Sequence, residues 1–207
     1  MSYSSIPTAY KGINMRSRLE ARWAWMFDAM GVRWEYEPID CAGWIPDFRL
    51  WPEGCSPVLV EIKPVSEFPQ DVAKKVEAAA PISADGRART SEHDSILILG
   101  SGPFRSISDP DTGGHGLEPS FARAVGWNLN GAGCMPVLMG VRRNGFKGNP
   151  QLNALYFCII SGDIALFRIA PVFGEVDRLD FAMDGGAHVD ALWREAGNAV
   201  QWKGRNG

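Results

Sequence analysis

A short alternating stretch, PVLVEIKP at residues 57–64, constrains the fold more than any other part of the sequence. Valine or isoleucine occupies every second position from Val58 to Ile62, which is the period of a β-strand. Glu61 and Lys63 fall together on the opposite face of that strand, roughly 7 Å apart. The sequence therefore predicts an acid and a base side by side at the end of one strand.

A second strand is predicted immediately upstream, because residues 44–50 are rich in β-forming side chains. The segment between the two strands, residues 51–57, contains two prolines and a glycine and has the composition of a turn. We expect the two strands to form a hairpin with Gly54 at the centre of its turn.

The register of this hairpin brings two carboxylates together. If the hairpin closes symmetrically, Phe48 pairs with Val60 and Asp47 pairs with Glu61. Opposed like charges repel, so such a pair needs a cation or a shared proton. Carboxylate oxygens from two strands suit Mg²⁺ or Mn²⁺, and Lys63 would orient or deprotonate a water molecule, or neutralise charge on a phosphate. An exposed strand face with ordinary charges is the competing interpretation.

The residues Pro46-Asp47 and Glu61-Ile62-Lys63 resemble the signature of the PD-(D/E)xK nuclease superfamily. In these restriction-endonuclease-like proteins, an acid, a second acid and a lysine on a β-hairpin bind the catalytic metal. Glu20, on a predicted helix upstream, matches the additional acid that many members carry. The resemblance covers about residues 10–80 of the 207, and what raises its weight is the order and spacing of the predicted elements.

The resemblance implies a fold and an activity. The fold is α/β, with a restriction-endonuclease-like αβββαβ core whose mixed sheet is flanked by helices, followed by a C-terminal β-rich extension and a terminal helix. The activity is Mg²⁺- or Mn²⁺-dependent hydrolysis of phosphodiester bonds in DNA. Asp47, Glu61, the Ile62 carbonyl and Glu20 would hold the metal, and Lys63 would position the attacking hydroxide.

The helix that carries Glu20 has two interpretations. It is predicted to begin after Ser17 and to end at Gly31, with one apolar face. That face consists of Leu19, Trp23, Met26, Phe27 and Met30. Glu20 lies at its edge, where a carboxylate can reach a site, but Ser17 and Glu20 also have the spacing of a capping box, in which Glu20 bonds the Ser17 amide. The sequence leaves both roles open.

The rest of the chain is expected to complete a single domain, residues 1–207, with its core at residues 10–100. Further core elements are a strand at 32–37, a helix at 66–80 and a strand at 95–100. Residues 101–133 are punctuated by glycine and proline and are predicted to form a long insertion or flap. Residues 134–207 are predicted to contain strands at 136–141, 155–161 and 164–169 and a helix from about Val189 to Trp202.

The formal net charge is −3, which argues against binding nucleic acid with the whole surface but leaves local basic patches open. The candidates for contact with the DNA backbone are Arg16, Arg18, Arg22, Lys74, Lys75, Arg142 and Arg143. Ordinary solvated side chains are the alternative for each. A nuclease-fold module that binds nucleic acid or protein with little catalysis also stays open, since the acidic balance favours it, although the acid, acid and lysine set argues against it.

The remaining features exclude other classes of protein. The 4 cysteines and 3 histidines are scattered, which indicates neither a zinc site nor a disulfide framework. No apolar run of the length needed to span a bilayer and no signal peptide is recognisable, so a cytoplasmic protein without membrane contact is expected. DNA is the expected partner, and a homodimer or a partner in a replication, recombination or transposition complex stays open. A compact chain of this kind suits a phage or mobile element in a bacterial cell.

Overall fold

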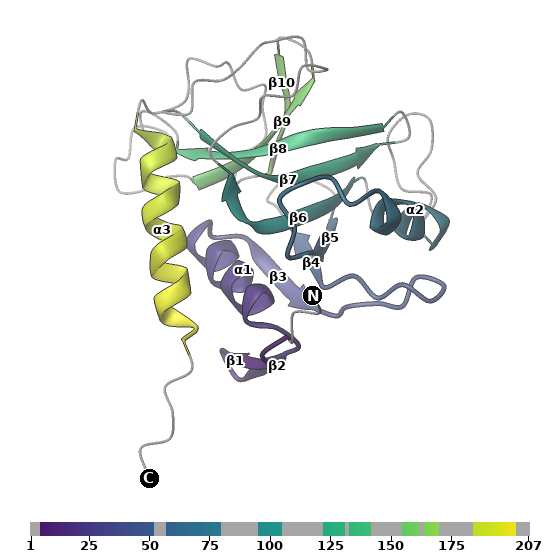
Figure 1. The fold of residues 1–207 in the computed structure, drawn as a ribbon, viewed down its shortest axis with the longest axis horizontal. Helices are drawn as coiled ribbons and strands as arrows, with labels where there is room; N and C mark the ends of the chain where they lie inside the picture. Colours follow the sequence, from purple (N-terminus) through teal and green to yellow (C-terminus); the bar gives the residue numbers. More distant parts are fainter. Residues whose placement is uncertain are drawn as a thin grey trace.

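The computed structural model describes residues 5–51, 57–79, 95–104, 122–130, 133–141, 155–161, 164–169 and 184–201. These residues form a mixed β-sheet with helices on both of its faces (Figure 1). The α/β class predicted from the sequence is therefore confirmed. No helix in this part of the chain has both the length and the apolar character needed to cross a membrane.

Eight strands of the described residues form one sheet in the order β10-β9-β8-β7-β6-β5-β4-β3. The β5–β6 pair is parallel, and the other neighbours are antiparallel. The strands are β3 (Arg33–Tyr36), β4 (Phe48–Trp51), β5 (Val58–Ile62), β6 (Ser95–Phe104), β7 (Ala122–Asn130), β8 (Gly133–Val141), β9 (Leu155–Ser161) and β10 (Ile164–Ile169).

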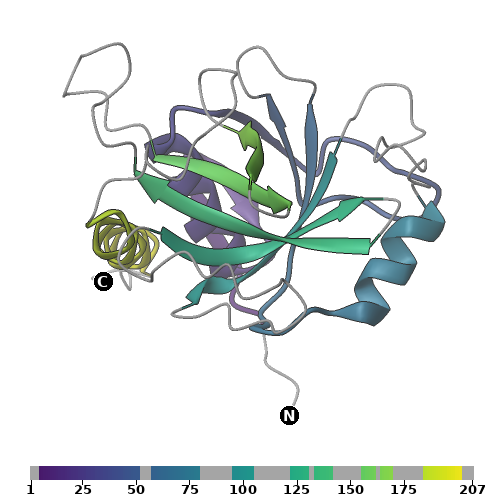
Figure 2. The same ribbon diagram turned by 90° about the horizontal axis from the view of Figure 1, so that it is seen from above.

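Helices cover the sheet on both sides (Figure 2). α1 (Arg18–Ala29) and α3 (Gly185–Ala199) pack on one face, and α2 (Gln70–Ala79) packs on the other. Each face buries its own apolar cluster, with Phe27 and Trp193 in the first and Val76 in the second. The chain thus forms three layers, and the parallel β5–β6 pair lies between the helices.

α1 begins and ends where the sequence predicted. The Ser17 hydroxyl accepts a hydrogen bond from the Glu20 amide at 3.1 Å, which is the N-cap contact. Gly31 follows the helix with φ of +68°, a conformation that favours glycine. The predicted apolar face is buried except at Leu19, which is only partly buried.

The register predicted for the central hairpin is confirmed, because Phe48 pairs with Val60. The predicted start of β4 is wrong, since the strand begins at Phe48 and not at Trp44. A tight turn precedes it, in which the amides and carbonyls of Cys41 and Trp44 bond each other across Ala42 and Gly43, both of which have positive φ. The residues at the centre of the hairpin turn, 52–56, lie outside the described residues.

Regular structure also occurs where the sequence predicted none. β7 occupies part of the segment predicted as an insertion or flap, and β6 extends into it as far as Phe104. Glycine usually weakens a strand, but at Gly126 a side chain would meet the Ile98 carbonyl of β6 at 2.2 Å. The glycine therefore permits the close β6–β7 contact. Residues 105–121 lie outside the described residues.

Near the N-terminus, the structure contains a short hairpin that the sequence did not predict. Its strands are β1 (Thr8–Tyr10) and β2 (Ile13–Met15), joined at Lys11 and Gly12, which both have positive φ. That pair of residues lacks the Asn-Gly signal on which a hairpin prediction depends. Two helices also start away from their predicted positions, since α2 begins at Gln70 and not at 66, and α3 already begins at Gly185.

Candidate active site

The predicted acids and lysine meet where β4 begins and β5 ends. Asp47 directly precedes β4, Glu61 is in β5, and Lys63 directly follows β5. Continuing the register by one residue from Phe48 and Val60 brings Asp47 to Glu61. Both carboxylates are buried, with 2% of Asp47 and 7% of Glu61 exposed to solvent.

Asp47 is held by one cation and one backbone amide. Its Oδ1 lies 2.6 Å from the Arg16 guanidinium, and its Oδ2 accepts a hydrogen bond from the Ile62 amide at 2.6 Å. Burial and the neighbouring charge of Glu61 raise the pKa of Asp47 to about 7, although the Ile62 amide opposes this rise. A buried acid that titrates near neutral pH, beside a second acid, is typical of a functional site.

The raised pKa makes stability depend on pH. Between about pH 4 and pH 7 the folded state binds the Asp47 proton more tightly than the unfolded state does. The stabilisation that comes from this proton is therefore fully present at low pH and is lost as the pH rises to about 7. In EDTA, we expect the free energy of unfolding to fall by on the order of 1–2 kcal/mol between about pH 5 and pH 8 because of this group.

Urea unfolding at both pH values measures this effect. The isosteric variant Asp47→Asn removes the titrating group and should show a smaller change, while the exposed acid Glu35, changed to Gln, serves as the control. Equal pH dependence in the wild type and in Asp47→Asn would contradict the prediction.

Glu61 is bound on both oxygens. Its Oε1 lies 2.5 Å from Lys63 Nζ, and its Oε2 accepts a hydrogen bond from the Trp44 indole at 2.8 Å. The tight turn at residues 41–44 brings the indole there. The Lys63 amide donates to the Leu99 carbonyl of β6, and its side chain is 33% exposed. Lys63 thus extends from a buried acid toward solvent.

Glu20 makes contacts near the N-terminus of α1 and also lies near Asp47. Its buried carboxylate accepts hydrogen bonds from the Ser17 hydroxyl and the Tyr36 hydroxyl, both at 2.7 Å, and from the Arg16 amide at 3.1 Å. The capping contact therefore goes to the Arg16 amide and not to the Ser17 amide. The Glu20 charge also contributes to raising the pKa of Asp47, after burial and Glu61. Glu20 thus contacts the N-terminal end of α1 and is a third acid near Asp47.

Arg16 takes a position that the sequence did not predict. Its guanidinium joins Asp47 and Glu37, with Nε 2.8 Å from the Glu37 carboxylate. The Glu37 amide also donates to the Asp47 carbonyl at 3.0 Å. Arg16 and Lys63 together neutralise the two buried acids.

The carboxylates of Asp47 and Glu61 are suitable ligands for a hard cation, but in this structure they are paired with Arg16 and Lys63. Carboxylate oxygens are the ligands that Mg²⁺ prefers. However, all four oxygens of Asp47 and Glu61 contact protein donors. Among the residues that the structure describes, no group of three or more His, Cys, Asp and Glu side chains is placed to hold a metal ion. The metal and the Ile62 carbonyl as its ligand stay predictions, and binding would require Arg16 or Lys63 to move.

The other basic residues predicted to contact DNA lie apart from the acids. Arg18 and Arg22 line a cleft between α1 and α3. Lys74 and Lys75 are exposed on α2, on the other side of the sheet from α1. Arg142 and Arg143 lie outside the described residues. Of the five candidates that the structure describes, only Arg16 lies directly at the acids.

Two contributors to the site were missed in the sequence. Tyr36 donates to Glu20, and burial together with this hydrogen bond raises the pKa of Tyr36 to about 12. The alternation in residues 32–37 puts Tyr36 on the same face as Trp34, which was a usable signal. Trp44 offered no such signal. The turn that directs its indole to Glu61 contains Ala42 at positive φ, a conformation that is not predicted for alanine.

Comparison with known proteins identified no relative of this chain. No protein-family model, no curated protein and no solved structure matches the chain. The function must therefore be inferred from the buried acids, the lysine and the arginine described above.

Proposed function

We propose that this protein is a Mg²⁺- or Mn²⁺-dependent deoxyribonuclease of the PD-(D/E)xK type. The observation that carries the proposal is the convergence of Asp47, Glu61 and Lys63 at one end of a β-hairpin, beside Glu20. The order α1-β3-β4-β5-α2-β6 also supports a restriction-endonuclease-like core. The DNA specificity within this class is left open.

The chemistry follows from the residues at the hairpin. Asp47, Glu61, Glu20 and the Ile62 carbonyl would hold the metal, which supplies a bound water of lowered pKa and positive charge near the phosphate. Lys63, with its ammonium between Glu61 and solvent, orients the attacking water and stabilises charge that develops on the phosphate. Water adds to phosphorus, the bond from phosphorus to the leaving sugar oxygen breaks, and that oxygen takes up a proton.

Arg16 has a role in the same scheme. Its guanidinium occupies Asp47 Oδ1, and its side chain is 58% exposed. Once displaced from Asp47, the guanidinium can bind a phosphate oxygen of the substrate, since its planar donor pair fits phosphate as well as carboxylate. The DNA contact predicted for Arg16 would then belong to the substrate-bound state.

The purified protein is expected to cut DNA in the presence of Mg²⁺ or Mn²⁺ and to lose this activity in EDTA. Plasmid, linear, single-stranded and branched DNA should each be tested, because the class of substrate is open. The matched control is Asp47→Asn, which keeps the side-chain shape and removes the charge. Failure to cut any of the four substrates with either metal would overturn the proposal.

One observation favours a second function. Because Arg16, Lys63, Trp44 and the Ile62 amide already satisfy the carboxylates, the fold is also consistent with a module that binds nucleic acid or protein with little catalysis. Calorimetric titration with Mg²⁺ and Mn²⁺ separates the two functions. A nuclease should bind metal, and Asp47→Ala should lose that binding, whereas a module has no such site to lose.

A further inference from the structure

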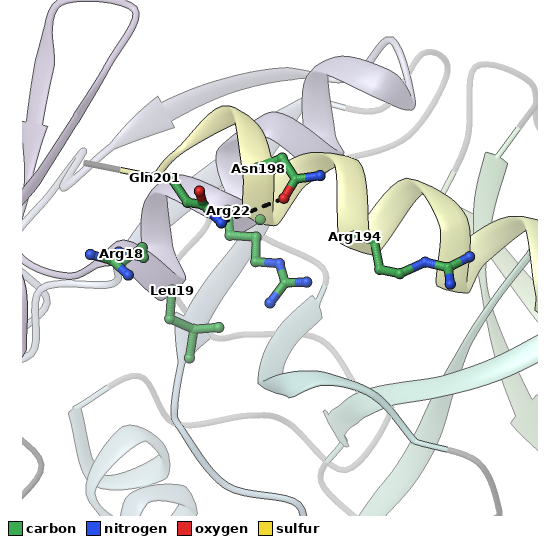
Figure 3. Close-up of a pocket in the computed structure, with 7 residues that line it drawn as sticks. Arg18, Leu19, Arg22, Arg194, Asn198 and Gln201 are labelled. Atoms are coloured by element: carbon green, nitrogen blue, oxygen red, sulfur yellow. Dashed lines mark hydrogen bonds between the residues drawn. The ribbon is translucent and has the colours of Figure 1, made fainter. Parts of the chain in front are cut away.

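A basic cleft lies between α1 and α3 (Figure 3). Its volume is about 550 Å³. Its lining comes from α1, α3 and the residues directly after α3, and consists of Arg18, Leu19, Arg22, Arg194, Gly197, Asn198 and Gln201. Arg18 and Arg22 are four residues apart and share one side of α1, while Glu20 points about 160° away from both. The cleft is therefore separated from the acids by the body of α1.

The lining is rich in hydrogen-bond donors and has no carboxylate. Three of its seven residues are arginines, and two more are side-chain amides. In the described part of the chain, none of these arginines forms an ion pair with an acid. The Arg18 Nε is buried and has no hydrogen-bond partner among the described residues. A buried donor of this kind is costly unless a ligand satisfies it.

Arg22 is fixed in place at the wall of the cleft. Its Nε and Nη2 donate to the Trp193 carbonyl at 2.9 and 2.5 Å, and its guanidinium lies 3.9 Å from the centre of the Trp193 ring. Burial lowers the pKa of Arg22 to about 10, because the cation is desolvated without a nearby acid. An anion in the cleft would compensate this charge.

We propose that this cleft binds a phosphate group of a nucleic-acid strand. Arginine donors suit phosphate oxygens, and the absence of acid from the lining favours an anion over a cation. The choice of a nucleic-acid strand as the source of the phosphate rests on the proposed nuclease function. The cleft would hold the strand outside the cleavage site and would do so without a metal.

The experiment measures binding in EDTA, where no cleavage interferes. A fluorescent single-stranded oligonucleotide is titrated with the wild type and with the double variant Arg18→Gln/Arg194→Gln, over a range of salt concentrations. Arg22 is left unchanged because it supports Trp193. We expect about tenfold weaker binding by the double variant and a fall of about 0.7 in the slope of log K against log salt, the value for one lost phosphate contact on a single strand.

The control is Arg33→Gln, which removes an exposed arginine from β3 and should bind like the wild type. Inorganic phosphate and a mononucleotide are tested as competitors. Equal binding by the wild type and the double variant, or no binding of the oligonucleotide by the wild type, would overturn the proposal. Binding of inorganic phosphate or the mononucleotide alone would overturn the strand as its source. The binding assay needs no metal, so its outcome does not depend on whether the protein cuts DNA in the cleavage assay.

Discussion

Changing Glu61 to Gln is expected to abolish metal-dependent DNA cleavage, with a loss of about a thousandfold or more in rate. Glutamine keeps the shape of the side chain and can still accept the hydrogen bond from the Trp44 indole. It lacks the charge that would hold a divalent cation and that pairs with Lys63 in the metal-free protein. The change thus removes the proposed chemistry while leaving most contacts in place.

The same variant should leave the metal-free protein nearly as stable as the wild type. Relief of the repulsion from Asp47 favours the variant, and loss of the contact with the partly exposed Lys63 disfavours it. We expect a net change within about 1 kcal/mol, since the two contributions oppose each other. Mg²⁺ should raise the melting temperature of the wild type only, because only the wild type binds it.

Thermal melts with Mg²⁺ and with EDTA, beside one cleavage assay, test both parts. Glu35→Gln is the matched control, because Glu35 is an exposed acid on β3. A Glu61→Gln protein that cuts DNA at the wild-type rate would eliminate Glu61 from the proposed site. A variant that has lost several kcal/mol of stability would show that the Lys63 contact dominates and that Glu61 is chiefly structural.

The hairpin register could be predicted because it depends on local information. The alternating run in β5 fixes which residues share a face, and a slip of one residue would turn Val58, Val60 and Ile62 away from their core. The N-cap at Ser17 and the stop at Gly31 are equally local, since each depends on one side chain or one φ value. The positions of the two acids follow from these elements.

The contacts that Arg16 and Trp44 make with the acids could not be predicted in the same way. Arg16 reaches Asp47 across 31 positions of sequence, and the Trp44 indole reaches Glu61 across 17. No periodic pattern in the sequence records such contacts, because they form only when distant segments of the chain pack together. Glu20 shows the same limit, because the sequence did not predict that its carboxylate accepts hydrogen bonds from the Arg16 amide and the Tyr36 hydroxyl.

In β7, tertiary packing overrides the general tendency of glycine to interrupt a strand. Its glycine suggested a break in regular structure, and a β-bulge does occur between Ala124 and Gly126. The strand continues nonetheless, because Gly126 lies against the backbone of β6 and pairs with Leu99. A glycine is needed at position 126 because the backbone of β6 lies against it, and the sequence of β7 alone does not reveal where β6 lies.

Gly126→Ala is expected to cost about 3 kcal/mol of stability, which corresponds to a fall of roughly 6–12 °C in melting temperature. The added Cβ would lie 2.2 Å from the Ile98 carbonyl and 2.9 Å from the Leu99 Cα. Both are backbone atoms of a central strand, so no side-chain rotation can relieve the overlap, and β6 and β7 must separate. Gly197→Ala is the control, because its Cβ would approach only the Arg22 guanidinium, at 3.1 Å, and it should stay within about 1 kcal/mol of the wild type.

The damage from Gly126→Ala should also reach the candidate site. The Leu99 carbonyl of β6 accepts the hydrogen bond from the Lys63 amide, so a displaced β6 shifts the residue that pairs with Glu61. We therefore expect any cleavage activity to fall together with stability, even at temperatures where the variant remains folded. Urea unfolding and the cleavage assay on the same preparation measure both effects. A variant with wild-type stability would show that β6 and β7 are not packed as closely as their backbone contact requires.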